Sequence, residues 1–92
     1  MKERRDTPIV LSVHAKDRLA QRGASAEEVA NTVREGDWQP AKRGKQHAAK
    51  QHEFGGLSPV NGLPYLYKTV DVVFADEAER IFVVTVKVYY SN

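Results

Sequence analysis

The sequence predicts an α+β fold in which two short helices come first and the C-terminal half forms a β-meander. Apolar residues recur with a helical period between residues 13 and 35. From residue 67 onward the chain alternates as a strand does and is rich in β-branched and aromatic residues. The chain has 92 residues, enough for one domain and too few for two, so we expect a single domain over residues 1–92.

The first helix is expected from about Val13 to Arg22. Ser12 precedes it as an N-cap, because its hydroxyl can accept from the free N–H groups of the first turn. Gly23 ends it, since glycine tolerates the left-handed conformation that is common after a helix. Before this helix we expect a short strand at Ile9 to Leu11 and a disordered polar lead-in at residues 1–8.

The second helix is expected to begin after Ser25 and to end at Glu35-Gly36. Ser25 and Glu28 are three positions apart and can form a capping box, in which each side chain satisfies the other's backbone N–H. One buried face follows the i, i+3, i+4, i+7 pattern. It comprises Ala26, Val29, Ala30 and Val33. Because so few residues separate the two helices, they should form a hairpin or corner.

After the second helix, Trp38 and Pro40 are expected to begin a connection. Trp38 is expected to cap that helix with its apolar ring, and the alternative is that it stacks on a base. A strand follows at Gln46 to Phe54. The segment from Gly55 to Pro64 holds three glycines and two prolines, so it should be a loop. Its length suggests a mobile segment or a cover over a site.

Two further strands are expected at Tyr67 to Ala75 and Ile81 to Tyr90, joined by a charged turn at Asp76 to Arg80. The last strand is nearly continuous in β-branched and aromatic residues, so it should be central in the sheet. If that strand is regular, one face carries Phe82, Val84, Val86, Val88 and Tyr90, and the other carries Ile81, Val83, Thr85, Lys87 and Tyr89.

Composition excludes several classes of protein. The chain has no cysteine, which rules out disulfides and thiolate metal sites. The N-terminal segment has basic residues but no following apolar run of signal-peptide length, and no stretch approaches the roughly 20 apolar residues of a membrane span. We therefore expect a cytoplasmic protein that is not bound to a membrane.

Three cationic side chains, His14, Arg18 and Arg22, recur at i, i+4 and i+8 on the first helix. They form one stripe beside Ala15 and Leu19, which should face the sheet. Arginine matches phosphate oxygens with a rigid fork of donors, and histidine exchanges protons near neutral pH. This row could hold a phosphodiester. Alternatively, His14 bonds to the backbone and the arginines pair with acids, which would be Asp17, Glu27 or Glu28.

A second basic cluster lies between residues 41 and 50, where Lys42, Arg43, Lys45 and Lys50 occur with no acid. It suggests a polyanion-binding face, and the alternative is a solvated loop. Lys50 and His52 share one face of the expected strand, with His47 on the other. Exposed strand histidines are the default interpretation, because no third metal ligand has suitable spacing.

The last strand offers Lys87 and Tyr89 on one face. If that face is open, the two side chains can contact a phosphate and stack on a base. If helices cover it, Tyr89 belongs to the core and Lys87 reaches the edge. No Gly-rich phosphate loop and no HExxH pattern occurs, so we expect neither a cofactor nor a metal.

The helical motifs resemble the opening of domain-of-unknown-function family 4258. The matching residues are Ser12-Val13-His14-Ala15, Arg18, Arg22-Gly23 and Ser25-Ala26-Glu27-Glu28-Val29. Residues 43–51, 70–74 and 83–86 resemble its middle strand and closing hairpin, so the resemblance spans about residues 9 to 90. The loop at 55–64 is longer than is typical of that family.

This family is similar to the compact RelE and BrnT ribonuclease toxins. The resemblance implies two N-terminal helices packed on a curved antiparallel sheet of three to four strands. It also implies metal-free RNA cleavage by basic and aromatic side chains, and an antitoxin protein as partner. The first hypothesis is accordingly an endoribonuclease in which His14 or His52 transfers a proton and Arg18, Arg22 and Lys50 stabilise the phosphate. Lys42, Arg43, Lys45, Lys87 and Tyr89 would then bind the RNA.

Two other functions remain open from the sequence. The same basic residues could serve a binding module, for nucleic acid or for a protein, that positions phosphates without cleaving them. The chain could also be a homodimer or scaffold piece joined through a free edge of its sheet.

Overall fold

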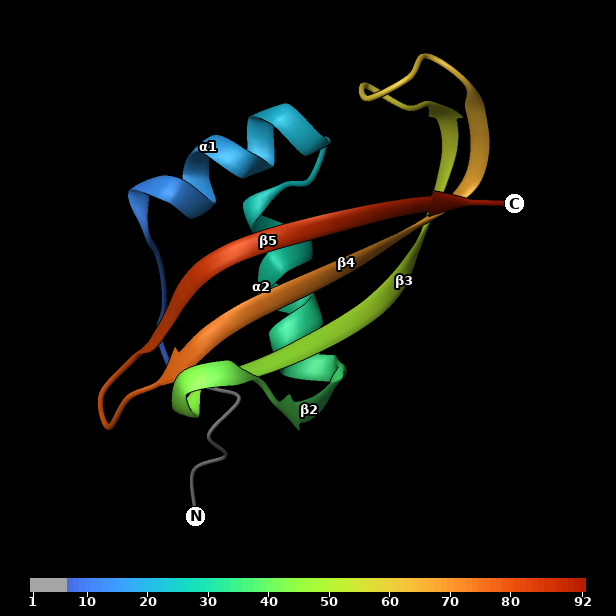
Figure 1. The fold of residues 1–92 in the computed structure, drawn as a ribbon. Helices are drawn as coiled ribbons and strands as arrows, with labels where there is room; N and C mark the ends of the chain where they lie inside the picture. The colour runs from blue at the N-terminus through green and yellow to red at the C-terminus, as the bar shows by residue number, and fades with distance from the viewer. Residues whose placement is uncertain (1–6) are drawn as a thin grey trace.

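The computed structural model describes residues 7–92 and has the predicted α+β architecture (Figure 1). Within that range the elements are β1 (Ile9–Leu11), α1 (Val13–Arg22), α2 (Ala26–Glu35), β2 (Asp37–Pro40), the short 3₁₀ turn η2 (Lys42–Gly44), β3 (Gln46–Leu57), β4 (Pro64–Asp76) and β5 (Ile81–Ser91). Residues 1–6 of the expected lead-in lie outside the described residues. Thr7 is buried, and the Pro8 carbonyl accepts a hydrogen bond from Ile81 N–H at 2.8 Å.

The sheet corrects the expected strand number and direction. The described residues form one mixed sheet of five strands in the order β1-β5-β4-β3-β2. β1 runs parallel to β5, and the other neighbours are antiparallel. β4 rather than β5 is therefore the middle strand. The segment expected to begin a connection at Trp38 is instead the edge strand β2. Pro40 is tolerated in an edge strand, because its missing N–H removes no hydrogen bond between central strands.

Both helices have the predicted bounds and caps. Ser12 Oγ accepts from Ala15 N–H at 3.0 Å, and Gly23 adopts a left-handed conformation with φ 79°. Ser25 and Glu28 form the expected capping box. The bounds of the two helices therefore follow from local signals.

The hydrophobic core lies between the two helices and one face of the sheet. It comprises Ala15, Val29, Val33, Ala48, Val70, Val72, Phe74, Ile81, Val83 and Val86, which are fully buried. Trp38 packs edge-on against Phe74, with ring centroids 4.8 Å apart, and its Nε1–H donates to the Val33 carbonyl, as expected of a cap on α2. The opposite face of the sheet points away from α2 (Figure 1). We call it the open face.

A bulge in β5 overturns the expected division of that strand into two faces. Val73 pairs with Thr85 and Phe74 pairs with Val83, so Val84 has no partner in β4. The extra residue reverses the alternation. As a result, Val83 and Val86 are both buried although they are three positions apart, while Lys87 and Tyr89 still point to the open face.

The loop expected at 55–64 is confirmed in its central part and is shorter than predicted. β3 continues to Leu57 and β4 begins at Pro64, so only residues 58–63 connect them. A register shift between Glu53 and Gly56, with Gly55 at φ 63°, lets the strand continue through the glycines. Leu57, Val60, Leu63 and Leu66 are exposed around this hairpin end.

Candidate nucleic-acid interface

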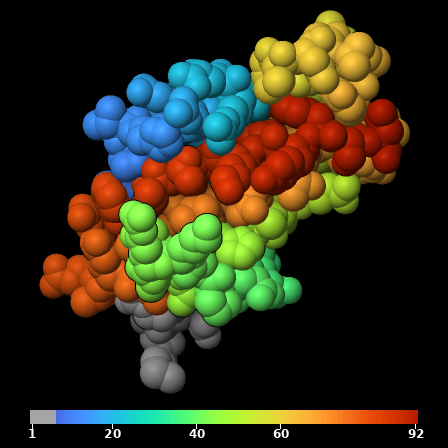
Figure 2. Space-filling model, in the orientation of Figure 1, coloured from blue at the N-terminus to red at the C-terminus, as the bar shows by residue number. Residues whose placement is uncertain are grey.

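A groove crosses the open face where the turn between β2 and β3 overhangs β4 and β5. It has a volume of about 540 Å³. We call it the open-face groove, and its lining comprises Pro40, Ala41, Lys42, Arg43, Lys45, His47, Asp71, Val73 and Lys87. Figure 2 shows the turn (green) standing out in front of the orange and red strands. The protruding turn thus forms a wall of the groove, and the surface of the strands forms its floor.

The overhanging wall is a tight hairpin turn built from Lys42 to Lys45. Lys45 N–H donates to the Lys42 carbonyl at 3.2 Å, and Ala41 N–H donates to the Lys45 carbonyl at 2.8 Å. Arg43 and Gly44 occupy its two central positions with φ of 61° and 73°. Positive φ at both positions is the pattern of a type I′ turn, which matches the twist of the flanking strands. The turn directs the neighbouring lysine and arginine side chains outward from the sheet.

Four permanent cations line the groove, Lys42, Arg43, Lys45 and Lys87. Within residues 7–92, none of them forms an ion pair with a carboxylate. Elsewhere in the same range, lysines and arginines do find partners: Lys50 pairs with Glu35, Lys68 with Glu28 and Arg80 with Glu77. Asp71 is the single carboxylate among the groove's lining residues, so positive charge predominates there, which favours an anion.

The floor of the groove holds a histidine and an aspartate in contact. His47 on β3 and Asp71 on β4 lie 3.3 Å apart, from Nδ1 to Oδ1. Sheet register brings them together, because His47 pairs with Val73 and Asp71 lies two residues along the same face. The two side chains remain 37% and 22% exposed, so a ligand in the groove can reach them.

A second hollow continues the open-face groove along β5. It has a volume of about 240 Å³ and is lined by Arg22, Lys87, Val88 and Tyr89. Lys87 borders both hollows, and the Tyr89 ring is 55% exposed beside it. Arg22 reaches this position from α1 because its Nη1–H donates to the Val86 carbonyl at the edge of β5, at 2.7 Å. The two hollows together give a cationic path with an aromatic ring at one end.

The cationic row expected on α1 does not act as one unit. Ala15 and Leu19 face the sheet as predicted, but His14 is exposed and makes no hydrogen bond or ion pair with another described residue. Arg18 Nη1–H donates to Gln21 Oε1, and its Nε is buried without a partner. Of the three, the structure places only Arg22 in a hollow with predicted RNA-binding residues, which are Lys87 and Tyr89.

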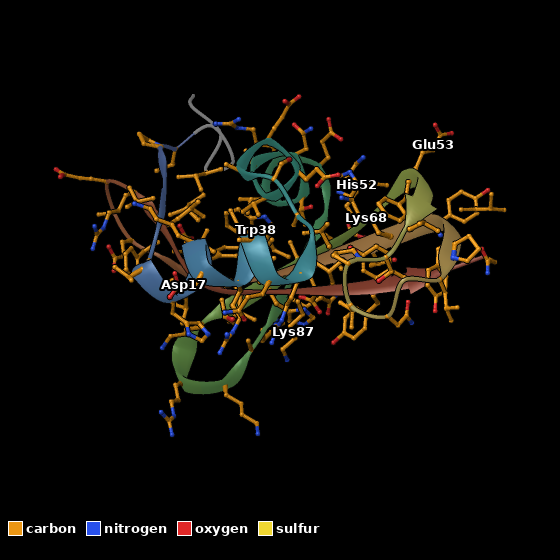
Figure 3. The ribbon with its side chains drawn as sticks, turned by 90° about the horizontal axis from the view of Figure 1, so that it is seen from above. Asp17, Trp38, His52, Glu53, Lys68 and Lys87 are labelled. Carbon is orange, nitrogen blue, oxygen red and sulfur yellow. The ribbon has the colours of Figure 1, made fainter. Side chains whose placement is uncertain are left out.

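Lys50 and His52 lie on the opposite face of the sheet from the groove, against α2. Lys50 Nζ is 3.3 Å from a Glu35 carboxylate oxygen, and His52 Nε2 is 3.2 Å from Thr32 Oγ1. Burial and the nearby Lys50 charge lower the pKa of His52. Figure 3 shows His52 on the α2 side of the strands and Lys87 on the other. The predicted catalytic set His14, Arg18, Arg22, Lys50 and His52 is therefore divided between separate surfaces.

Lys68 forms a further polar cluster on the helix side of the sheet. This lysine is only 6% exposed; its ammonium lies 2.9 Å from Glu28 Oε1 and donates to the Gly23 carbonyl at 2.7 Å. Burial would raise the pKa of Glu28, but hydrogen bonds from Lys68 and from Ser25 N–H outweigh it, so the pKa is lowered. The cluster joins the corner between the helices to β4 and is part of the structural core.

Sequence reasoning missed the His47–Asp71 pair and the role of Lys68. His47 was expected as an ordinary exposed strand histidine, and Asp71 only as part of a hairpin. The missing information is the register between β3 and β4, which decides which residues of the two strands are neighbours. Strand alternation did correctly separate His47 from Lys50 and His52.

The described residues contain neither a metal-binding cluster nor a membrane-spanning helix. Among residues 7–92, no three His, Cys, Asp or Glu side chains gather closely enough to hold a metal ion. Neither helix in that range has the length and apolar character needed to cross a membrane.

Comparison with known proteins finds no family model, no curated protein and no solved structure that matches this chain.

Proposed function

We propose that this protein binds single-stranded RNA along the open face of its sheet. The observation that carries the proposal is the set of four cations without a carboxylate ion pair in the open-face groove, one of which, Lys87, shares β5 with the exposed Tyr89. Lys42, Arg43 and Lys45 contact phosphates from the turn, and Lys87 contacts the next phosphate from the floor. These contacts hold the backbone without selecting a base sequence.

Tyr89 gives the proposed site its preference for a single strand. Its ring is exposed two residues along β5 from Lys87, a separation of about 7 Å in an extended strand. An unstacked base can lie on such a ring, whereas the bases of a duplex are already stacked on each other. Arg22, on the far side of Lys87, extends the cationic path to one more phosphate.

The salt dependence of RNA binding tests this proposal. Fluorescence anisotropy of a short labelled single-stranded RNA of mixed sequence would be measured against the protein at several salt concentrations. With five phosphates contacted, we expect log K to fall with log salt with a slope of about −3.5, from about 0.7 per contact. Replacing Lys42 or Lys87 with Gln should each reduce the magnitude of that slope by about 0.7.

Lys16→Gln provides the matched control, because Lys16 is an exposed lysine of α1 that lies outside both hollows. It should leave the slope unchanged. RNA binding that is absent, or that does not respond to salt, would contradict the proposal. Equal losses in the Lys16, Lys42 and Lys87 variants would show a general charge effect and would contradict the assignment to this groove.

A second candidate function is metal-independent RNA cleavage of the toxin type. The resemblance to the RelE and BrnT toxins supports it, and so does the imidazole of His47 inside the cationic groove. RNA carries its own nucleophile in the 2′-hydroxyl, so the protein need supply only charge and proton transfer. Fragments formed from RNA in the presence of a chelator, together with arrested growth of bacteria that express the protein, would support this candidate. Intact RNA and normal growth would reject it.

A further inference from the structure

We infer that His47, held by Asp71, is the proton-transferring residue of an RNA-cleaving centre in the open-face groove. The inference rests on the proposed RNA-binding function and adds to it. Neither residue belongs to the set that the sequence resemblance indicated.

The contact with Asp71 fixes which ring nitrogen of His47 carries the proton. An ionised carboxylate can only accept a hydrogen bond, so the bond from Nδ1 to Oδ1 requires a hydrogen on Nδ1. In the neutral ring the lone pair is then on Nε2, the nitrogen that does not contact Asp71. A carboxylate that orients the far nitrogen of a histidine in this way is a common feature of general bases.

The surroundings of the pair suit a reaction at phosphorus. The lysines and arginine of the groove surround His47 and form no ion pair with other described residues, so their charge is available to a phosphate. Donors fixed around a developing negative charge supply much of the stabilisation in such reactions. The 3.3 Å contact is long for a hydrogen bond, as catalytic hydrogen bonds often are before substrate binds.

The reaction balances without a metal or a further reagent. His47 Nε2 takes the proton of the ribose 2′-hydroxyl, and the 2′ oxygen forms a bond to phosphorus. The bond from phosphorus to the 5′ oxygen breaks, and that oxygen takes a proton from solvent, which reaches the open groove. His47 returns its proton to solvent. The products are a 2′,3′-cyclic phosphate and a 5′-hydroxyl end.

His47→Gln tests the inference in the full-length protein. The change preserves a polar side chain of similar length but removes the base. We expect cleavage of single-stranded RNA in chelator to slow by about 100-fold or more, the usual contribution of a general base, while anisotropy shows RNA binding retained. His14→Gln, prepared in the same way, replaces one of the two histidines that the sequence suggested and should leave cleavage unchanged, because His14 lies outside the groove.

Asp71→Asn tests the positioning role separately. The amide can donate to Nδ1, which would move the ring proton to Nε2 and block it as a base. We expect kcat to fall with KM unchanged, and the ¹⁵N shifts of His47 to change from the Nδ1–H tautomer to the Nε2–H tautomer. A variant that loses activity without a change of tautomer would contradict the positioning role.

The outcomes separate this inference from the binding proposal. Cleavage by the wild type that is abolished in His47→Gln with binding retained supports both. Cleavage that persists in His47→Gln overturns the inference, as does RNA binding with no cleavage by the wild type, and in the second case the binding proposal stands. If the wild type binds no RNA, both fail.

Discussion

Lys68 and Lys87 carry the same charge in opposite surroundings. Lys68 is buried on the helix side of β4, where Glu28 and the Gly23 carbonyl satisfy its ammonium. Lys87 is exposed on the other face of the neighbouring strand and borders both hollows. At the scale of single residues, function therefore depends on whether a cation already has a partner, which residue type alone does not reveal.

Removing the Lys68 ammonium should destabilise the fold without affecting RNA binding. Lys68→Met keeps the aliphatic volume but leaves the partly buried Glu28 carboxylate and the Gly23 carbonyl without their donor. We expect the free energy of unfolding, measured by urea titration, to fall by about 1–3 kcal/mol. Lys16→Met, at an exposed site, should change it by less than about 0.5 kcal/mol. Equal stability of the two variants would refute the structural role of Lys68.

Among the elements, the turn between β2 and β3 is where local stability and proposed function conflict. Arg43 holds a left-handed conformation, which costs a residue with a side chain about 1–2 kcal/mol unless it is of the Asn or Asp type. Asn-Gly is the favoured pair at the centre of such a turn, yet this chain has Arg43-Gly44. Strain of this kind is tolerated where a side chain is needed for another purpose.

Arg43→Asn should consequently have effects of opposite sign on stability and on binding. We expect the free energy of unfolding to rise by about 0.5–1 kcal/mol as the strain is relieved. The salt slope of RNA binding should fall in magnitude by about 0.7, because one phosphate contact is lost. Lys42→Asn should weaken binding similarly without the gain in stability, because Lys42 does not have a positive φ. Unchanged binding by Arg43→Asn would remove Arg43 from the interface.

The elements also differ in how far the sequence could predict them. Both helices were predicted with correct bounds, because Ser12, Gly23, Ser25 and Glu28 act on the backbone within a few residues. The strands depend on partners distant in sequence. Nothing local to Ile9–Leu11 indicates a parallel partner in β5, and nothing near Val84 indicates a bulge that reverses the faces of the strand.

For the same reason the candidate site was predicted only in part. The cations of the turn and the pair Lys87 and Tyr89 were predicted from composition and alternation, and the structure brings them to one face. The helical spacing of His14, Arg18 and Arg22 was predicted correctly. Which of them would lie near the open face depends on how α1 packs on the sheet, which their spacing does not specify. His47 and Asp71 became neighbours only through strand register, which the sequence does not specify.

For the whole molecule, the two faces of one sheet differ in composition and in the pairing of their charges. The helix-covered face is apolar at its centre, and its charged groups are paired, including Lys50 with Glu35 and Lys68 with Glu28. The open face retains unpaired cations, a histidine and an exposed tyrosine. Variants of the first face should alter stability, and variants of the second should alter RNA binding.

The most direct test of this division is to map the bound RNA on the protein by NMR. Backbone amide shifts of ¹⁵N-labelled protein would be followed during titration with single-stranded RNA. We expect the largest changes in residues 42–47, Asp71 and residues 87–89, with little change in α2. Changes centred on the exposed side of α1 around His14, or on Lys50 and His52, would contradict the assignment of the interface to the open face.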